Sequence, residues 1–215
     1  MNYPPLVAYD LISDDVREWQ VTPVFSSPIS MIEIEDDICS KLKKLCHESV
    51  WQDDSVDSGD NGAVSENHYV LNDELKKYFE TSCSSLVRGV LGYDTDVQLT
   101  TSWFTKTNED GSCVEHVHCN SWYSGVVYFD EYDDNSSCLQ FVSNSSNICP
   151  METFQYNFLN ARTWNVYPTT GLLVLFPSDL RHRVVKNKNT KTRYSMAFNI
   201  MPKGVTGYKD SVFVY

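Results

Sequence analysis

Three histidines in the second half of the chain have the residue type and spacing of metal ligands. His116 and His118 are two residues apart, and at that spacing two side chains of a β-strand point to the same face, with Cα atoms roughly 6–7 Å apart. Both imidazoles could then bind one ion at about 2.0–2.2 Å from each nitrogen. His182 follows a short apolar segment at residues 172–176, and a neighbouring strand can bring it to the same point. Three imidazoles suit Fe(II), Zn(II), Mn(II) or Ni(II).

The same histidines also fit a molecule that carries out no chemistry. His-x-His pairs occur in protein cores and on surfaces, so a non-catalytic β-sandwich binding module is an alternative interpretation. His47 and His68 fall at a predicted helix end and in a predicted loop, and we interpret both as structural or incidental. If carboxylates held the metal instead, Asp130 and Asp133 would be the first candidates.

A second group of residues has the chemistry of a carboxylate-binding site. Arg193 and Ser195 are two residues apart, so on a strand both face the same side. A guanidinium donates two parallel, charge-assisted hydrogen bonds to a carboxylate, and a neighbouring hydroxyl can donate a third. An edge-strand arginine in solvent is the alternative interpretation. Aromatic residues that could form the walls of a pocket are Trp103, Trp122, Tyr123 and Tyr128.

The order and spacing of these residues resemble a known family. The pattern is His-x-His, then Ser-Gly-Val-Val-Tyr, then Gly-x-Leu-x-Leu-Phe-Pro-Ser-x-Leu-x-His, and finally Arg-x-Ser. It is similar to that of the 2-oxoglutarate/Fe(II)-dependent oxygenases, and more narrowly to small oxygenases of this superfamily found in bacteria and phages. The resemblance covers close to half of the chain, from Trp103 to Pro202. The pattern occupies residues 116–118, 124–128, 171–182 and 193–195.

This resemblance implies a fold, an activity and roles for single residues. The fold is a double-stranded β-helix (jelly roll), and the activity is hydroxylation of an unidentified substrate with Fe(II), 2-oxoglutarate and O2, releasing succinate and CO2. The resemblance implies that His116 and His182 hold the iron and that Arg193 with Ser195 binds the distal carboxylate of 2-oxoglutarate. We expect Tyr128 to join them as a cosubstrate-binding residue. The sequence does not distinguish a small-molecule substrate from a peptide or a nucleobase.

One position departs from the usual pattern of the superfamily. Asp or Glu commonly stands two residues after the first histidine, where this chain has His118. A third neutral imidazole would leave the iron one charge unit more positive, which should raise its reduction potential and slow oxygen activation. We predict that His116, His118 and His182 together bind the metal and form the catalytic centre. Alternatively, His118 only supports the other ligands, or His118 is itself the first ligand and Asn120 the second.

A cupin-type metal enzyme that works without 2-oxoglutarate is the competing enzyme class. The histidines at 116 and 118, with residues 168–171, His182 and Asn187, also resemble the histidine pattern of cupins. Cupins commonly carry a glutamate four or five residues after the pair, and none stands there. A weak visible charge-transfer band on anaerobic addition of Fe(II) and 2-oxoglutarate would separate the oxygenase from both alternatives.

Two helices are predicted in the first part of the chain. Ser30 and Glu33 have the spacing of a capping box before an apolar helical pattern. Asn72 offers the N-cap of a second helix, which the glycines at 89 and 92 should end. The polar residues 52–67 between them predict a loop. The expected apolar faces are Ile34, Ile38, Leu42 and Leu45 in the first helix and Leu75, Phe79, Leu86 and Val90 in the second.

The pattern changes from helical to alternating after residue 96. Residues 97–105 alternate in the manner of a half-buried strand, and residues 108–111 form a turn signal. Seven or eight short strands are typical of a sandwich or a small barrel. We therefore predict an α+β chain, mainly β, whose N-terminal helices pack on one sheet of an antiparallel core. The further strands are expected through 116 and 118, and near 124–129, 138–142, 171–176, 182–185 and 193–200.

Composition and charge limit the classes of function. The 215 residues suffice for one domain, with a helical support region at 1–95 and the β core at 96–215. A net charge of −12 disfavours general nucleic-acid binding, and no apolar run is long enough to span a membrane. Seven irregularly spaced cysteines and no signal-peptide pattern predict reduced thiols in the cytoplasm, which is the host cytoplasm if a phage encodes the chain. The oligomeric state is not specified.

Overall fold

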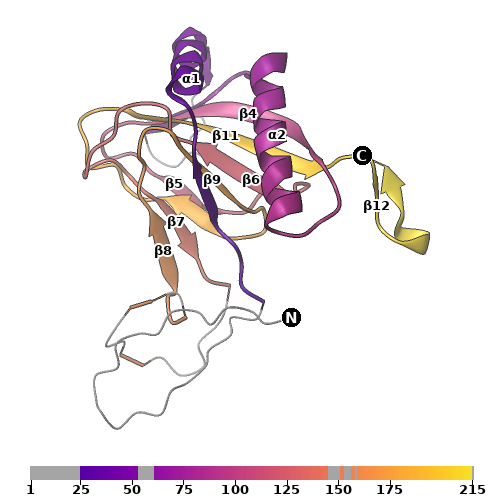
Figure 1. Cartoon of the computed structure of the whole chain (residues 1–215). Coiled ribbons are helices and arrows are strands. Elements are labelled where there is room, and N and C mark those ends of the chain that lie inside the picture. The colour runs from indigo at the N-terminus through magenta and orange to yellow at the C-terminus, as the bar shows by residue number, and fades with distance from the viewer. Residues whose placement is uncertain (1–24, 53–60, 145–150, 153–155, 158, 215) are drawn as a thin grey trace.

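The computed structural model describes residues 25–52, 61–144, 151–152, 156–157 and 159–214. These residues form two antiparallel sheets with two helices and a small C-terminal hairpin (Figure 1). The helices are α1 (Asp36–Glu48) and α2 (Asp73–Gly89), and a short 3-10 helix lies at Lys209–Ser211. The hairpin consists of β12 (Val205–Thr206) and β13 (Phe213–Val214).

The two sheets have distinct strand orders. The larger sheet runs β1 (Ser30–Glu33), β9 (Leu172–Pro177), β6 (Tyr123–Val127), β11 (Arg193–Pro202), β4 (Val97–Thr107), β3 (Gly62–Ser65) and β2 (Trp51–Gln52). The smaller sheet runs β5 (Cys113–His116), β10 (His182–Val184), β7 (Leu139–Val142) and β8 (Thr163–Val166).

The longest pairing joins β4 and β11 within the larger sheet. It extends from Arg193 opposite Thr107 to Pro202 opposite Val97. Because side chains alternate between the two faces of a strand, one face of this pair is apolar and the other is open to a cavity. The apolar face includes Phe104, Met196 and Phe198, and the opposite face includes Trp103, Thr105, Ser195 and Ala197.

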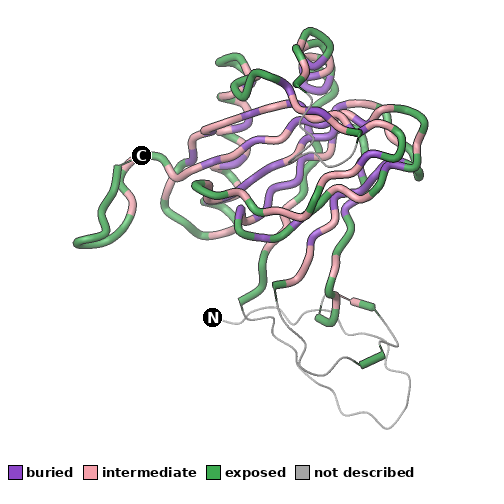
Figure 2. The backbone as a smooth tube through the Cα atoms, turned by 180° about the vertical axis from the view of Figure 1, so that it is seen from behind, coloured by how far each residue is buried: buried purple, intermediate pink, exposed green. Residues whose placement is uncertain are grey.

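Two hydrophobic cores lie on the two sides of the larger sheet. The first contains buried residues of both helices, such as Leu42 and Phe79, together with Phe104 and Phe198 of the sheet. The second joins β9 and β6 with the smaller sheet through Phe141, Phe176 and neighbouring side chains. Figure 2 shows buried positions concentrated in the strands, whereas the C-terminal hairpin is exposed.

The start of the first helix differs from the prediction. Residues Ser30–Glu33, predicted as a capping box, form β1 and pair with residues 172–175 of β9. Helix α1 instead begins at Asp36, and Asp36 and Asp37 in its first turn interact favourably with the helix dipole. Backbone pairing with the edge of the larger sheet therefore outweighs the local capping signal.

The second helix begins where it was predicted. The side chain of Asn72 accepts a hydrogen bond from the Leu75 N–H at 3.0 Å, which confirms the N-cap. The predicted apolar face is wrong at its end, because Val90 follows the helix and is 75% exposed. The buried stripe consists of Leu75, Phe79, Cys83 and Val87.

Most strands predicted after residue 96 are confirmed, with bounds shifted by a few residues. Two predictions are corrected. Strand β5 ends at His116, so His118 lies outside it. Residues 62–65, predicted as loop, form β3 on β4, because Ala63 and Ser65 alternate into the interior. The short strands β8, β12 and β13 were not predicted, and residues 53–60 of the predicted loop lie outside the described residues.

Two further predictions concern membranes and thiols. No helix in the described part of the chain is long and apolar enough to cross a membrane. Cys39, Cys46, Cys83, Cys119 and Cys138 are free thiols, and the reducing compartment stays a prediction.

The packing of β6 against β11 generates the first prediction, at Gly125. A Cβ atom at this position would lie 2.2 Å from the ring of Phe198, which itself packs on Phe79 with ring centroids 5.6 Å apart. We expect Gly125→Ala to lower the free energy of unfolding by about 1–3 kcal/mol through overpacking, as measured by chemical denaturation. Gly89→Ala is the matched control, because a Cβ there meets no atom within 4 Å. Equal stability of the two variants would contradict the packing argument.

Candidate active site

The three predicted histidines converge on one point. Each offers a ligand atom, and these atoms lie within 4.8 Å of one another. His116 at the end of β5 is the cross-strand partner of His182 at the start of β10, and their ring centroids are 4.3 Å apart. The ring of His118 is 5.1 Å from each of the other two. The donor set of three imidazoles therefore fits a divalent transition metal.

His118 reaches this point by a route that strand spacing did not predict. It follows the end of β5, and its backbone N–H donates to the carbonyl of Ser178 at 2.9 Å. Ser178 is itself fixed by hydroxyl hydrogen bonds to Ser124 at 2.8 Å and to Ser121 at 2.9 Å. A serine network that links the start of β6 to the segment between β9 and β10 thus anchors the third imidazole.

Backbone carbonyls orient two of the three rings. The Nδ1 atom of His116 lies 2.8 Å from the carbonyl oxygen of Val114, and that of His182 lies 2.8 Å from the carbonyl of Leu180. A carbonyl can only accept, so Nδ1 carries the proton in both rings. The Nε2 lone pair of each ring is then available to a metal, which is how hydrogen bonding commonly orients histidine ligands.

Burial keeps two of the imidazoles neutral. Desolvation, followed by the neighbouring His116, lowers the pKa of His118 to about 4 and the pKa of His182 to about 3. A histidine must be neutral to bind a metal. At neutral pH these two ligands therefore need to lose no proton on binding.

The imidazoles and the predicted carboxylate-binding residues share one cavity. Its volume is about 610 Å³, and its lining includes the three histidines, Arg193 and Ser195. Arg193 is only 3% exposed, which excludes the interpretation of an edge-strand arginine in solvent. Its guanidinium donates to the Ser195 hydroxyl at 3.2 Å and to the Tyr128 hydroxyl at 3.1 Å, and the Ser195 hydroxyl is 2.8 Å from that of Thr105.

The guanidinium of Arg193 has no acidic partner within the described part of the chain. Its buried Nε has no hydrogen-bond acceptor there. Burying an uncompensated charge is costly. An anion that enters the cavity with a planar carboxylate would satisfy this group, so the site fits a carboxylate ligand beside a metal.

Other candidates from the sequence lie elsewhere. Trp103 lines the cavity as predicted. The lining does not include the other predicted wall residues, Trp122, Tyr123 and Tyr128, nor Asn120, Asp133 and His47. Asp130 forms an ion pair with Lys43 at 2.7 Å. His68, for which the sequence predicts a structural or incidental role, also lines the cavity. No local sequence signal marks His68, because its place depends on contacts with a distant strand.

Nearly half of the chain matches one family model. A family model described as "Putative 2OG-Fe(II) oxygenase" matches residues 101–199. None of the curated proteins compared with the chain matches it. The resemblance predicted from the sequence motifs is confirmed by the family match, and residues 101–199 carry the 2OG-Fe(II) oxygenase domain.

Solved structures of similar fold come from bacteria and an animal. A prolyl-4-hydroxylase from Pseudomonas putida has a TM-score of 0.58 at 13% identity, and the match covers 83% of this chain and 95% of that one. HygX from Streptomyces hygroscopicus, solved with nickel, 2-oxoglutarate and hygromycin B, has a TM-score of 0.59 at 10% identity, covering 85% and 86%. A prolyl hydroxylase from Trichoplax adhaerens, bound to a hypoxia inducible factor peptide, has a TM-score of 0.58 at 14% identity, covering 80% and 83%.

These findings indicate a class of protein. The family match over residues 101–199 and the three converging imidazoles point to a 2-oxoglutarate-dependent oxygenase, a class whose cofactors are Fe(II), 2-oxoglutarate and O2. The predicted oxygenase therefore prevails over the cupin and the non-catalytic module.

The lowered pKa values generate a prediction for the metal-free protein. Since His118 and His182 have pKa values below the ordinary value of about 6.5, the unfolded chain binds more protons than the folded chain between pH 6.5 and 4. Stability should therefore fall as the pH decreases through this window. The measurement is urea denaturation at several pH values with a chelator present.

Two variants check the origin of this slope. His118→Asn should make the fall between pH 6.5 and 5 shallower, because one perturbed group is lost. His47→Asn, which removes an exposed histidine of α1, is the control. A slope that is unchanged in His118→Asn would contradict the assignment.

Proposed function

We propose that His116, His118 and His182 hold Fe(II), and that Arg193, Ser195 and Tyr128 bind the distal carboxylate of 2-oxoglutarate. One observation carries this proposal: a buried guanidinium that forms no ion pair with any described carboxylate lines the same cavity as three converging imidazoles. A metal alone would not use Arg193, and a carboxylate ligand alone would not use the imidazoles. A cosubstrate with a carboxylate at one end and metal-binding oxygens at the other uses both.

Each protein group has a separate task in this proposal. The bound metal supplies the activation of O2 and the oxidation of a C–H bond, with succinate and CO2 as products. Carbonyls of Val114 and Leu180 orient two imidazoles, and Ser178 anchors the loop of the third. The hydroxyls of Ser195 and Tyr128 accept hydrogen bonds from the guanidinium of Arg193. The guanidinium is therefore oriented before a carboxylate binds.

We also propose the finer fold assignment. The two antiparallel sheets would form a double-stranded β-helix core at residues 96–215, and the region 1–95 would support the larger sheet with α1 and α2. Shared buried side chains such as Leu42, Phe79 and Phe198 favour this arrangement. The whole chain would be a single domain.

The substrate and the cellular setting are proposals as well. HygX binds hygromycin B and the Trichoplax adhaerens enzyme binds a peptide, so we propose a small-molecule or peptide substrate. The net charge of −12 argues against general nucleic-acid binding. We propose a cytoplasmic protein without membrane association, since five of its cysteines are free thiols.

Removal of one imidazole tests the metal site. His182→Ala should abolish tight binding of one divalent ion, because a two-ligand site does not hold the ion against a chelator. Metal content after dialysis against a chelator is the measurement, and His47→Ala is the matched control. Unchanged stoichiometry in His182→Ala would refute the ligand assignment.

Truncation of the guanidinium tests the cosubstrate site. Arg193→Ala should weaken 2-oxoglutarate binding by about 30- to several-thousand-fold, since loss of one partner of a buried charge pair typically costs about 2–5 kcal/mol. Arg193→Lys should restore only part of the affinity, because an ammonium cannot form two parallel bonds. Calorimetric titration of the Zn(II)-loaded protein gives both values.

The control for this test is an arginine on the outer face of the smaller sheet. Arg183 is exposed and bonds to Gln140 at 2.8 Å, so Arg183→Ala should leave 2-oxoglutarate affinity and metal content unchanged. Wild-type affinity for 2-oxoglutarate in Arg193→Ala would contradict the cosubstrate assignment.

A further inference from the structure

The cavity has a second wall that the metal and 2-oxoglutarate assignments do not use. It is formed by His68, Tyr69, Trp103, Val114 and Val117. Tyr69 is 70% exposed, Val114 48% and Val117 41%, so apolar groups surround the opening. We call these five residues the aromatic wall.

Trp103 lies at the centre of the aromatic wall. Its ring centroid is 5.7 Å from that of His118, in a tilted arrangement, and 6.1 Å from that of His68, which meets it edge-on at 90°. A group that packs on this indole therefore lies beside the imidazole of His118. On the neighbouring strand Ala197 is the partner of Trp103, and this small side chain leaves room above the indole.

Backbone hydrogen bonds fix the outer part of the wall. Ser102 on β4 donates its N–H to the His68 carbonyl at 2.9 Å and accepts from the Val70 N–H at 3.2 Å. The Tyr69 N–H is bonded to the Asn67 side chain at 2.8 Å. His68 and Tyr69 are therefore held against β4 before any ligand arrives, which favours recognition of a rigid shape.

Charge at the wall is absent. Among the described residues that line the cavity, Lys106 and Arg193 are the only lysine and arginine, and there is no aspartate or glutamate. The Lys106 Nζ lies 4.8 Å from the centroid of Trp51, which belongs to the helix-side core. Arg193 belongs to the proposed cosubstrate site. A charged substituent placed against the wall would thus lose water without gaining a partner.

We infer that the aromatic wall binds an uncharged, apolar ring of the substrate. Packing on Trp103 would place this ring beside the three imidazoles of His116, His118 and His182. The inference rests on the proposed function, because it assumes that 2-oxoglutarate occupies the Arg193 end of the cavity. A ring fits this wall better than a flexible chain, since aromatic faces and edges give stacking contacts beyond those of area burial. The ring can belong to a free small molecule or to a side chain of a peptide.

The test uses three probes that share one ring and differ in charge. Benzyl alcohol is neutral, benzylamine is cationic and benzoate is anionic at neutral pH. Each is titrated by saturation-transfer NMR into the Zn(II)-loaded protein that already holds 2-oxoglutarate, so that Arg193 is occupied. Benzyl alcohol should bind at least about tenfold more tightly than either charged probe, because a charge at the wall would have no partner.

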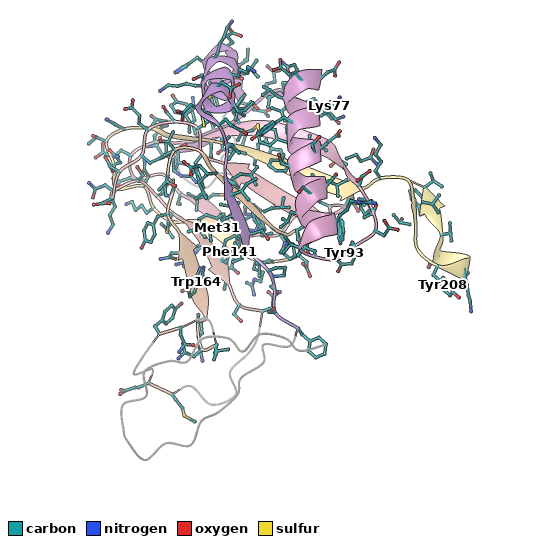
Figure 3. The ribbon with its side chains drawn as sticks, in the orientation of Figure 1. Met31, Lys77, Tyr93, Phe141, Trp164 and Tyr208 are labelled. Carbon is teal, nitrogen blue, oxygen red and sulfur yellow. The ribbon has the colours of Figure 1, made fainter. Side chains whose placement is uncertain are left out.

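Two substitutions locate the binding site. Trp103→Leu should weaken benzyl alcohol by about 2- to 13-fold through the loss of ring stacking, and His68→Ala should weaken it in the same direction. Trp164→Leu is the matched control, because Trp164 lies on β8 outside the cavity and projects from the smaller sheet (Figure 3). Affinity for 2-oxoglutarate, measured in each variant, should stay at the wild-type value.

A peptide probe distinguishes the two sources of the ring. Acetyl-Gly-Phe-Gly-amide carries the same phenyl ring on a neutral backbone. If it binds at least tenfold more tightly than benzyl alcohol, the ring belongs to a peptide substrate. Equal or weaker binding assigns the ring to a small molecule.

The outcomes separate this inference from the proposed function. Preference for the neutral ring, together with weaker binding of benzyl alcohol in Trp103→Leu and unchanged binding in Trp164→Leu, supports the aromatic wall. Equal binding of the charged probes, or wild-type affinity in Trp103→Leu, overturns it while 2-oxoglutarate binding leaves the proposed function intact. If the wild-type protein binds no 2-oxoglutarate, the proposed function fails, and this inference fails with it.

Discussion

The antiparallel pairing of β4 with β11 is the constraint on which the rest of the molecule depends. One face of the pair is buried against the helices through Phe104, Met196 and Phe198, and the other face lines the cavity. The register sets Ser195 opposite Thr105 and Ala197 opposite Trp103. A slip by one residue would turn the cavity residues into the helix-side core, so packing and binding chemistry specify the same register.

The smaller sheet supplies two of the three imidazoles, and polar side chains connect it to the larger sheet. Asn187 is completely buried, and its amide donates to the carbonyls of Thr107 and Asn108 at 3.1 and 3.2 Å. Its oxygen accepts from the Ser137 N–H at 3.2 Å. These bonds tie the end of β4 to the segments that follow β10 and precede β7. The distance between the imidazole cluster and Arg193 is therefore held by a rigid frame.

Residue spacing predicted much of the site because its key residues lie on long strands. The alternation of residues 97–105 and the pair Arg193 and Ser195 follow directly from strand geometry, and both are found as predicted. His118 was assigned to the same strand as His116, but it lies in the following loop, where the Ser178 carbonyl holds it. The alternation of side chains with a period of two residues holds within a strand, so it cannot predict where a loop residue such as His118 lies.

The errors share one physical cause. Local signals at Ser30 and at residues 62–65 were overridden by pairing with strands far along the chain. His68 became part of the cavity through backbone contacts with Ser102. Asn72 was predicted correctly because an N-cap needs only the next few residues. Interactions within one turn of helix are visible in the sequence, whereas those set by tertiary pairing are not.

The charge balance of the cavity has a thermodynamic consequence. Its described lining holds the Arg193 guanidinium, the Lys106 ammonium and four imidazoles, three of them clustered, and no carboxylate that offsets these groups. A divalent cation bound there would add two positive charges without neutralisation by a ligand, and a dicarboxylate would bring two negative ones. Each should therefore raise the affinity of the site for the other, and by linkage the two factors must be equal. An imidazole in place of a carboxylate ligand makes the metal and the dianion mutually dependent partners.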